Sequence, residues 1–205
     1  MKVFLFSVLT IALIIGGVFL FPDMSPEPSL GPLYENSVVV AFGDSITYGT
    51  GASDGYSWPE QLSEMTGISI INEGVPGETI SKGLERLPVV VEKHDPQLVL
   101  LCEGGNDILR KRDMEEIAGD LDEMVSYLSD HMIDVVVMGV PAFGLSMSVP
   151  DFYREIAERY GAVYDGEILK KVLSDPSLKS DLVHPNHEGY RIIAEGLYSI
   201  LSGAL

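Results

Sequence analysis

The sequence predicts an α/β fold, a three-layer α/β/α sandwich with a central parallel sheet. Two observations support this prediction. Short apolar runs alternate along the chain with longer segments whose apolar residues recur at helical spacing, which is typical of strands and helices that follow one another. The apolar runs lack the polar alternation of a half-exposed strand, so we expect strands that helices cover on both faces.

Four segments are the predicted strands, and each is a short apolar run of mainly branched residues. They are Val38–Phe42, Ile68–Ile71, Leu98–Cys102 and Val135–Val140. Ligands of open parallel sheets bind beyond the carboxyl ends of the strands. The loops that follow these four segments are therefore the expected place of a functional site.

Helices are predicted between and after the strands. Ser57 followed by Glu60 fits a capping box that begins a helix, and Gly67 fits the end of that helix. Two further segments have apolar residues at helical spacing. They contain Met114, Ile117, Leu121, Val125 and Leu128, and near the end of the chain Ile192, Ile193, Leu197 and Ile200.

A chain of 205 residues with 46% hydrophobic composition has the length of one domain, which we place at residues 37–205. Residues 1–21 are set apart, because residues 3–21 carry no charge and approach the roughly 20 residues that span a bilayer. The flanking Lys2 predicts a membrane anchor with the domain outside the cytoplasm. The alternative is a cleaved signal segment that releases a secreted or periplasmic domain. Residues 22–36 hold four prolines and are the predicted linker.

The chain is acidic, with a formal net charge of −18 at pH 7. Such a surface repels nucleic acid and other polyanions, so we expect no nucleic-acid partner. The single cysteine, Cys102, lies within a predicted strand and has no second cysteine with which to form a disulfide. We expect it to pack as a small hydrophobic residue.

Polar residues follow three of the predicted strands. Gly43-Asp44-Ser45 comes after the first, Asn72-Glu73-Gly74 after the second, and Gly104-Gly105-Asn106-Asp107 after the third. A serine at the end of a strand can present its hydroxyl at the edge of the sheet. The hydroxyl is a weak nucleophile until a base takes its proton, so a histidine is required.

His184 is the predicted base. Of the four histidines, only His184 has an acid close by in the same loop, since Asp181 precedes it by three residues. The Asp181 carboxylate accepts from one ring nitrogen while the other faces Ser45, which is the arrangement of a serine triad. The remaining histidines are assigned to a turn, a helix end and a first helical turn: His94, His131 and His187.

In order and position, these segments resemble the motifs of the SGNH hydrolases, the GDSL-type esterases and lipases. Gly43-Asp44-Ser45-Ile46 is similar to the first block, with Ile46 where leucine is usual, and Gly74, Asn106 and Asp181–His184 are similar to the other three. The resemblance spans about residues 38–200 and implies the flavodoxin-like fold of that family. It also implies an oxyanion hole formed by the N–H groups of Ser45 and Gly74 and the side-chain amide of Asn106.

The Gly-x-Ser-x-Gly motif of the α/β-hydrolases is absent around Ser45, which argues against that other fold. The resemblance implies hydrolysis of carboxylic esters through an acyl-Ser45 intermediate, with no metal and no organic cofactor. Lysophospholipase, arylesterase, thioesterase and carbohydrate O-deacetylase activities are all compatible with it. The motif residues do not separate these activities.

Specificity is expected from two loops, residues 107–113 and residues 142–150. Apolar residues of the second loop either line a groove for an acyl chain or pack on the domain. They are Phe143, Leu145, Met147 and Val149.

Two alternatives use the same residues differently. A metal-dependent hydrolase would leave Ser45 and Asn106 without roles and would bind one imidazole where zinc sites usually take more. A non-catalytic envelope protein that binds glycan or lipid would leave the complete catalytic set unexplained. We therefore expect a serine hydrolase of small-molecule or lipid esters. The ligands of the metal alternative would be Asp44, Asp107, Asp181 and His184.

Overall fold

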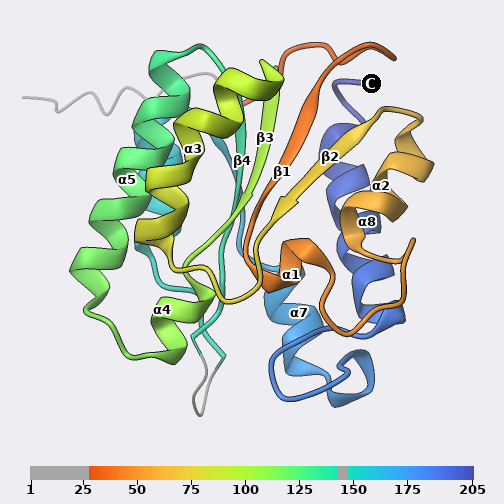
Figure 1. The fold of residues 1–205 in the computed structure, drawn as a ribbon, viewed down its shortest axis with the longest axis vertical. Coiled ribbons are helices and arrows are strands. Elements are labelled where there is room, and N and C mark those ends of the chain that lie inside the picture. Colours follow the sequence, from red (N-terminus) through yellow and green to blue (C-terminus); the bar gives the residue numbers. More distant parts are fainter. Residues whose placement is uncertain (1–27, 143–146) are drawn as a thin grey trace, which may run out of the picture.

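Strand β1 (Val39–Gly43) runs through the middle of the protein with β2 (Ile70–Gly74) on one side and β3 (Leu98–Cys102) on the other. The computed structural model describes residues 28–142 and 147–205. In this part of the chain, β4 (Asp134–Met138) and β5 (Val163–Asp165) complete a parallel sheet in the order β2-β1-β3-β4-β5. The predicted parallel sheet is confirmed (Figure 1).

The four predicted strands are present: one has the predicted bounds, and the ends of the other three shift by one to three residues. All residues of the two central strands β1 and β3 are buried, as expected from their continuous apolar character. Strand β5 was not predicted from the sequence. This strand has three residues, is half-buried and lies at the edge of the sheet, so it lacks the long apolar run that marks the others.

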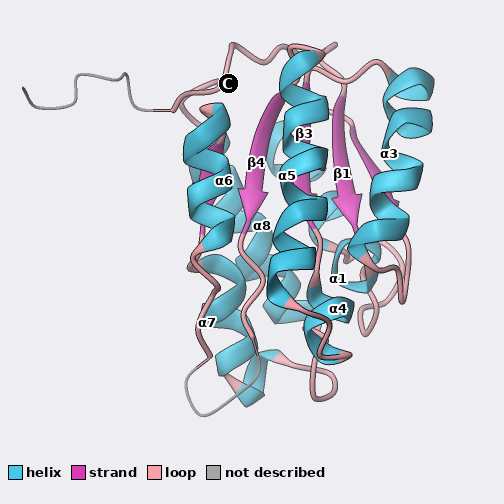
Figure 2. Ribbon diagram, turned by 90° about the vertical axis from the view of Figure 1, so that its left-hand side faces the viewer, coloured by secondary structure: helices cyan, strands magenta, loops and turns pink. Residues whose placement is uncertain are grey.

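Helices cover both faces of the sheet. One layer contains α3, α5 and α6, which Figure 2 shows side by side, and the other contains α2, α7 and α8. Two short helices, α1 and α4, lie at the carboxyl ends of the strands. The bounds are α1 (Ser45–Tyr48), α2 (Trp58–Thr66), α3 (Ile80–His94), α4 (Gly105–Leu109), α5 (Met114–Asp130), α6 (Phe152–Tyr160), α7 (Ile168–Ser174), a 3₁₀ turn (Pro176–Leu178) and α8 (His187–Leu201).

The predicted start and end of α2 are confirmed. Ser57 Oγ accepts from the backbone N–H of Glu60, and the Glu60 carboxylate accepts from the N–H of Ser57 at 3.1 Å. Gly67 ends the helix in a left-handed conformation with φ of 72°. The two segments with apolar residues at helical spacing are α5 and α8, whose buried residues face the sheet.

The last residues of the predicted linker are attached to the domain. The N–H of Gly31 donates to the Asp134 carboxylate at 2.7 Å, and the N–H of Leu33 donates to the carbonyl of Ala204 at 2.7 Å. The Leu33 side chain is buried, so this stretch does not act as a free spacer. The predicted membrane segment, residues 3–21, lies outside the described residues, among which no helix has the length and apolar character to cross a bilayer.

The register of the sheet determines where the polar loops meet. Gly43, the last residue of β1, lies opposite Gly74 of β2 and Cys102 of β3. The loops that follow these three strands therefore leave the sheet at the same edge, where α1 and α4 begin.

Candidate active site

Ser45 is the first residue of α1 and directly follows β1 and Asp44. Asp44 caps this helix, because its Oδ1 accepts from the N–H of Ile46 at 2.9 Å. The strand must turn sharply here, and a Cβ on Gly43 would collide with the carbonyl oxygen of Cys102 and with the Thr47 hydroxyl. The glycine therefore allows the tight turn that holds Ser45 at the edge of the sheet.

Ser45, His184 and Asp181 form a continuous chain of hydrogen bonds, as predicted from the sequence. His184 Nε2 lies 2.9 Å from Ser45 Oγ, and His184 Nδ1 lies 2.7 Å from Asp181 Oδ2. The second carboxylate oxygen of Asp181 accepts from the backbone N–H groups of Val183 and His184, both at 2.8 Å. The carboxylate thus fixes the orientation of the imidazole as well as its position.

The ionisation of Asp181 suits this arrangement. Partial burial acts to raise the pKa of Asp181, but the hydrogen bonds from the His184 ring and from two backbone N–H groups outweigh it and lower the pKa to about 2. The carboxylate is therefore ionised at neutral pH and accepts the Nδ1 proton of His184. This leaves Nε2 free to take the proton of Ser45.

The loop that carries His184 is packed directly against the loop that follows α1. A Cβ on Gly51 would overlap the hydroxyl of Ser180 and would lie 2.9 Å from the carbonyl oxygen of Pro185. The hydroxyl of Tyr190, in α8, donates to the carbonyl of Thr50 at 2.7 Å. These contacts join the end of the chain to its beginning and bring His184 within reach of Ser45.

Asn106 lies in the first turn of α4, and its amide nitrogen has two acceptors. Its Nδ2 donates to Asp44 Oδ2 at 3.1 Å and to the carbonyl of Glu78 at 2.9 Å. Gly104 precedes the helix with φ of 99°, and a Cβ there would lie 2.5 Å from the Tyr153 hydroxyl. Both the positive φ and the nearby Tyr153 hydroxyl therefore favour glycine at position 104.

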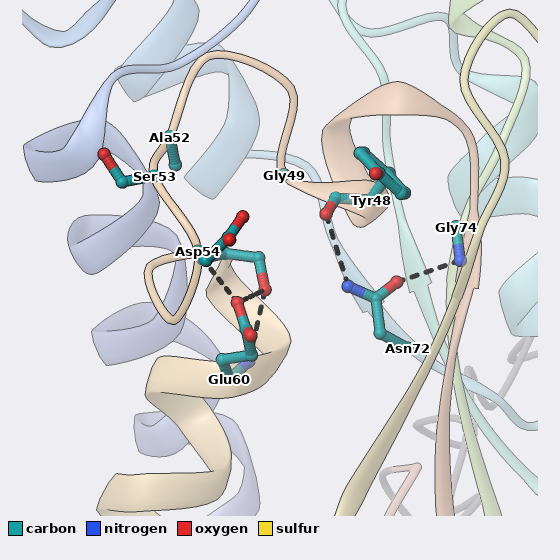
Figure 3. Close-up of a pocket in the computed structure, with 9 residues that line it drawn as sticks. Tyr48, Gly49, Ala52, Ser53, Asp54, Glu60, Asn72 and Gly74 are labelled. Atoms are coloured by element: carbon teal, nitrogen blue, oxygen red, sulfur yellow. Dashed lines mark hydrogen bonds between the residues drawn. The ribbon is translucent and has the colours of Figure 1, made fainter.

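Gly74 does not join Ser45 and Asn106 in the way the sequence analysis expects. Its N–H donates to Asn72 Oδ1 at 2.9 Å, and Asn72 Nδ2 donates to the carbonyl of Tyr48 at 3.4 Å (Figure 3). Asn72 Nδ2 also donates to the carbonyl of Thr47 at 3.0 Å. A Cβ on Gly74 would collide with the backbone nitrogen of Tyr48. Gly74 therefore packs β2 against α1, and it borders a separate polar cavity of about 350 Å³.

A second glycine of the same stretch, Gly77, was not among the predicted site residues. Gly77 lies in the turn between β2 and α3 with φ of 80°, and its carbonyl accepts from Arg110 at 3.1 Å. The next residue, Glu78, accepts from Asn106 through its carbonyl. Among the described residues, the N–H of Gly77 has no hydrogen-bond acceptor. The close spacing of the two glycines in the sequence is the signal that could have drawn attention to it.

A small, mainly apolar cavity of about 70 Å³ adjoins Ser45, His184 and Asn106. Leu109, from the first predicted specificity loop, forms part of its wall. Met147, from the second, lies instead near α7, where its sulfur accepts from the Ser174 hydroxyl at 3.5 Å, and Phe143 and Leu145 lie outside the described residues. The apolar wall consists of Ile46, Leu109, Val140, Leu173 and Val183.

The carboxylates that the metal alternative requires have other partners. Asp107 Oδ2 accepts from the N–H of Ile80 at 2.8 Å, which fixes the start of α3, and Asp107 Oδ1 accepts from Arg112 at 3.3 Å. Within residues 28–142 and 147–205, no three His, Cys, Asp or Glu side chains are grouped so that they could hold a metal ion.

Two buried acids directly follow strands β1 and β3. Burial raises the pKa of Asp44 to about 6, although the hydrogen bond from Ile46 opposes the shift. Burial also raises the pKa of Glu103 well above its usual range, and the nearby Asp44 and Glu78 carboxylates add to the increase. Glu103 is not conspicuous in the sequence, because this residue directly follows the apolar run of β3 and its burial depends on α3 packing over it.

Comparison with known proteins assigns the chain to a family. The model of the GDSL-like lipase/acylhydrolase family matches residues 41–192. The chain is 31% identical over 168 residues to an arylesterase of Vibrio mimicus, which covers 77% of this chain and 84% of that protein. It is 27% identical over 172 residues to the Escherichia coli (strain K12) thioesterase 1/protease 1/lysophospholipase L1, with 77% and 79% covered.

Solved structures agree with this assignment. The esterase AlinE4, described as an SGNH-hydrolase family member, is 32% identical, with a TM-score of 0.63 and coverage of 84% of this chain and 96% of that one. The esterase EstA of Pseudoalteromonas has a TM-score of 0.72 over 82% and 98% of the two chains at 21% identity, and so supports the fold alone. On these matches, the chain belongs to the GDSL-like lipase/acylhydrolase (SGNH hydrolase) family and is a carboxylic ester hydrolase.

Proposed function

We propose that this enzyme hydrolyses esters of short acyl groups, with the activity of an arylesterase. The observation that carries the proposal is the volume of the apolar cavity next to Ser45, about 70 Å³. Pockets that bind drug-sized ligands usually measure about 300–1,000 Å³, so this cavity is several times smaller. An acetyl or propionyl group fits this space, whereas a long acyl chain has to extend beyond it.

In the proposed mechanism, Ser45 Oγ attacks the ester carbonyl carbon while His184 Nε2 takes the hydroxyl proton. The ionised Asp181 stabilises the imidazolium that forms, and His184 then gives the proton to the leaving alcohol oxygen as the ester bond breaks. Water enters, loses a proton to His184 and attacks the acyl carbon. The acid is released, and Ser45 regains its proton from His184.

The oxyanion formed during both attacks needs hydrogen-bond donors. We assign the N–H of Ser45 and the side-chain amide of Asn106 to this role, because both residues line the same cavity. For the third donor we favour the N–H of Gly77 over that of Gly74. The Gly74 N–H is already bound to Asn72, whereas the Gly77 turn contacts Asn106 through the neighbouring carbonyl of Glu78.

The Vibrio mimicus arylesterase, at 31% identity, supports an aryl alcohol as the leaving group. Removal of acetyl groups from carbohydrates is the second candidate, since an acetyl group would occupy the same cavity and only the alcohol would differ. Long-chain lysophospholipids and thioesters are less favoured, because the cavity of the described residues accommodates only the first atoms of their acyl chains.

A series of p-nitrophenyl esters of increasing acyl length tests the proposal. We expect kcat/KM to be highest for acyl chains of about two to four carbons and to fall with longer chains, because extra methylenes do not find a preformed cavity. Replacement of Leu109 by Ala enlarges the cavity and should shift the optimum to longer chains. Leu182→Ala is the matched control, since Leu182 is 84% exposed and does not line the cavity.

A rise of kcat/KM up to eight or more carbons in the parent enzyme would contradict the short-chain proposal while leaving the esterase assignment intact. The same assays with acetylated sugars and with thioesters would separate the alternative leaving groups. Chelator provides a further control. If EDTA inactivates the enzyme and added metal restores it, metal-dependent hydrolysis replaces the serine mechanism.

We also propose that the enzyme is exported and held at the membrane by residues 3–21. The support is the absence of charge from this segment together with the positive charge of Lys2 before it. In this arrangement the active site faces small-molecule or lipid esters outside the cytoplasm.

A further inference from the structure

The carboxylate of Asp44 links the two parts of the catalytic site. Asp44 is 3% exposed and directly precedes Ser45. Its Oδ1 accepts from the N–H of Ile46 at 2.9 Å and thereby caps the helix that carries the nucleophile. Its Oδ2 accepts from Asn106 Nδ2 at 3.1 Å, across 62 positions of sequence. A single side chain thus contacts both the nucleophile helix and the proposed oxyanion donor.

The amide of Asn106 has a donor end and an acceptor end, and only the donor end stabilises an oxyanion. Two acceptors surround Nδ2, the carboxylate of Asp44 and the carbonyl of Glu78. If the amide rotated by 180°, its oxygen would face these two acceptors, neither of which has a hydrogen to donate while Asp44 is ionised. The two acceptors therefore fix which end of the amide faces the cavity.

The two acceptors of the Asn106 amide differ in the strength of the hydrogen bond they accept and in how they are held in place. The Glu78 carbonyl belongs to a loop that Arg86 holds in place, since Arg86 Nη2 lies 2.6 Å from the Glu78 carboxylate. Asp44 supplies the charged acceptor, and hydrogen bonds to an ionised group are roughly twice as strong as neutral ones. A Cβ on Gly105 would lie 3.0 Å from Asp44 Oδ2, so glycine at this position leaves space for the carboxylate to reach Asn106.

We propose that Asp44 is a positioning residue for ester hydrolysis, whose carboxylate holds the Asn106 amide with its donor end toward Ser45. The proposal rests on the proposed function, because the orientation of Asn106 affects turnover only if Asn106 stabilises the oxyanion. When the oxyanion forms on the carbon bonded to Ser45 Oγ, it shares or takes over the amide hydrogen that faces Asp44. The other amide hydrogen stays with Glu78.

The test is a double-mutant cycle with Asp44→Ser and Asn106→Ala. Serine is a good helix-capping residue, so it can retain the cap on α1, but it is too short to reach Asn106. We expect Asp44→Ser to lower kcat by about 10- to 100-fold with a much smaller change in KM. In the Asn106→Ala background, the same substitution should cause almost no further loss of kcat.

Two additional variants complete the test. Asp44→Asn keeps the size of the side chain and one acceptor oxygen, so its kcat should lie between those of the parent and of Asp44→Ser. Asp113→Ser makes the same chemical change at the cap of α5, where Asp113 accepts from Glu115 and Glu116 and contacts no catalytic residue. This control should retain the kcat of the parent within about twofold.

If the losses from Asp44→Ser and Asn106→Ala multiply, Asp44 acts independently of Asn106 and the proposal is wrong. An increase of kcat in Asp44→Ser would also overturn it, because Asp44 would then compete with the substrate for the Asn106 hydrogen. Should Asp44→Ser not fold, the same cycle with Asp44→Asn decides. The proposed function fails separately if Asn106→Ala leaves kcat unchanged or if Ser45→Ala remains active.

Discussion

His184 Nε2 lies 2.9 Å from Ser45 Oγ although 139 positions separate the two residues. Ser45 is at the start of α1, and His184 is in the loop before α8. The close packing of Gly51 against residues 180–185 brings the two segments together. The orientation of the imidazole depends in turn on Asp181, in the same loop. The nucleophile and the base are thus carried by separate segments that tertiary contacts hold together.

Replacement of Ser45 by Ala should abolish turnover and leave the fold intact. The hydroxyl is needed for the covalent acyl intermediate, so we expect kcat to fall by about 10⁴-fold or more, with a melting temperature close to that of the parent. Ser53→Ala, at an exposed serine of the loop after α1, is the control and should stay active. Activity of Ser45→Ala within tenfold of the parent would disprove the triad.

Replacement of Asn106 by Ala should lower kcat by about 10²–10³ with a far smaller change in KM, equivalent to roughly 3–4 kcal/mol. The bond from the amide strengthens as negative charge develops, so it stabilises the transition state more than the bound substrate. Asn106→Asp should be worse still, since a carboxylate would face the oxyanion. A lowered melting temperature with kcat of the folded fraction unchanged would assign Asn106 to loop structure alone.

Replacement of Gly74 by Ala should reduce stability, because the added methyl group collides with the backbone of Tyr48. We expect the free energy of unfolding to fall by about 1–3 kcal/mol, as is common for overpacked sites. Urea unfolding measures this change, and ester hydrolysis at a temperature well below the transition measures kcat. Unchanged stability together with a hundredfold lower kcat would restore Gly74 as the oxyanion donor.

The stability of the enzyme should depend on the ionisation of Glu103. Burial raises the pKa of this carboxyl well above its usual range, so the folded protein keeps a proton that the unfolded chain loses near the ordinary pKa of 4.5. Stability therefore falls as pH rises from that value through the folded pKa. Glu103→Gln carries no titrating proton and should lack this fall.

Urea unfolding of the parent and of Glu103→Gln at several pH values between about 4 and 9 measures the effect. We expect the variant to gain stability relative to the parent as pH rises. The nearby Asp44 titrates in both proteins, so the difference between them isolates Glu103. A difference that is constant over this range would show that Glu103 titrates alike in the folded and unfolded states.

Removal of residues 1–27 should give a soluble and active enzyme. This boundary preserves the contacts of Gly31 with Asp134 and of Leu33 with Ala204, which deletion of the whole linker would break. The full-length protein should instead sediment with membranes and require detergent for extraction. Recovery of the full-length product as a soluble protein whose first residue lies near Pro22 would identify residues 1–21 as a cleaved signal.

The sequence by itself determined the parallel sheet, the capped start of α2 and the pairing of Asp181 with His184. These features follow from local causes: continuous apolar runs, a capping residue at a fixed spacing, and an acid within one turn of a histidine. The tertiary structure alone decided which glycine N–H has no acceptor among the described residues, which side chains line the cavity, and that Asn106 donates to Asp44. Each of these depends on contacts between residues far apart in the chain, and such contacts leave no periodic pattern in the sequence.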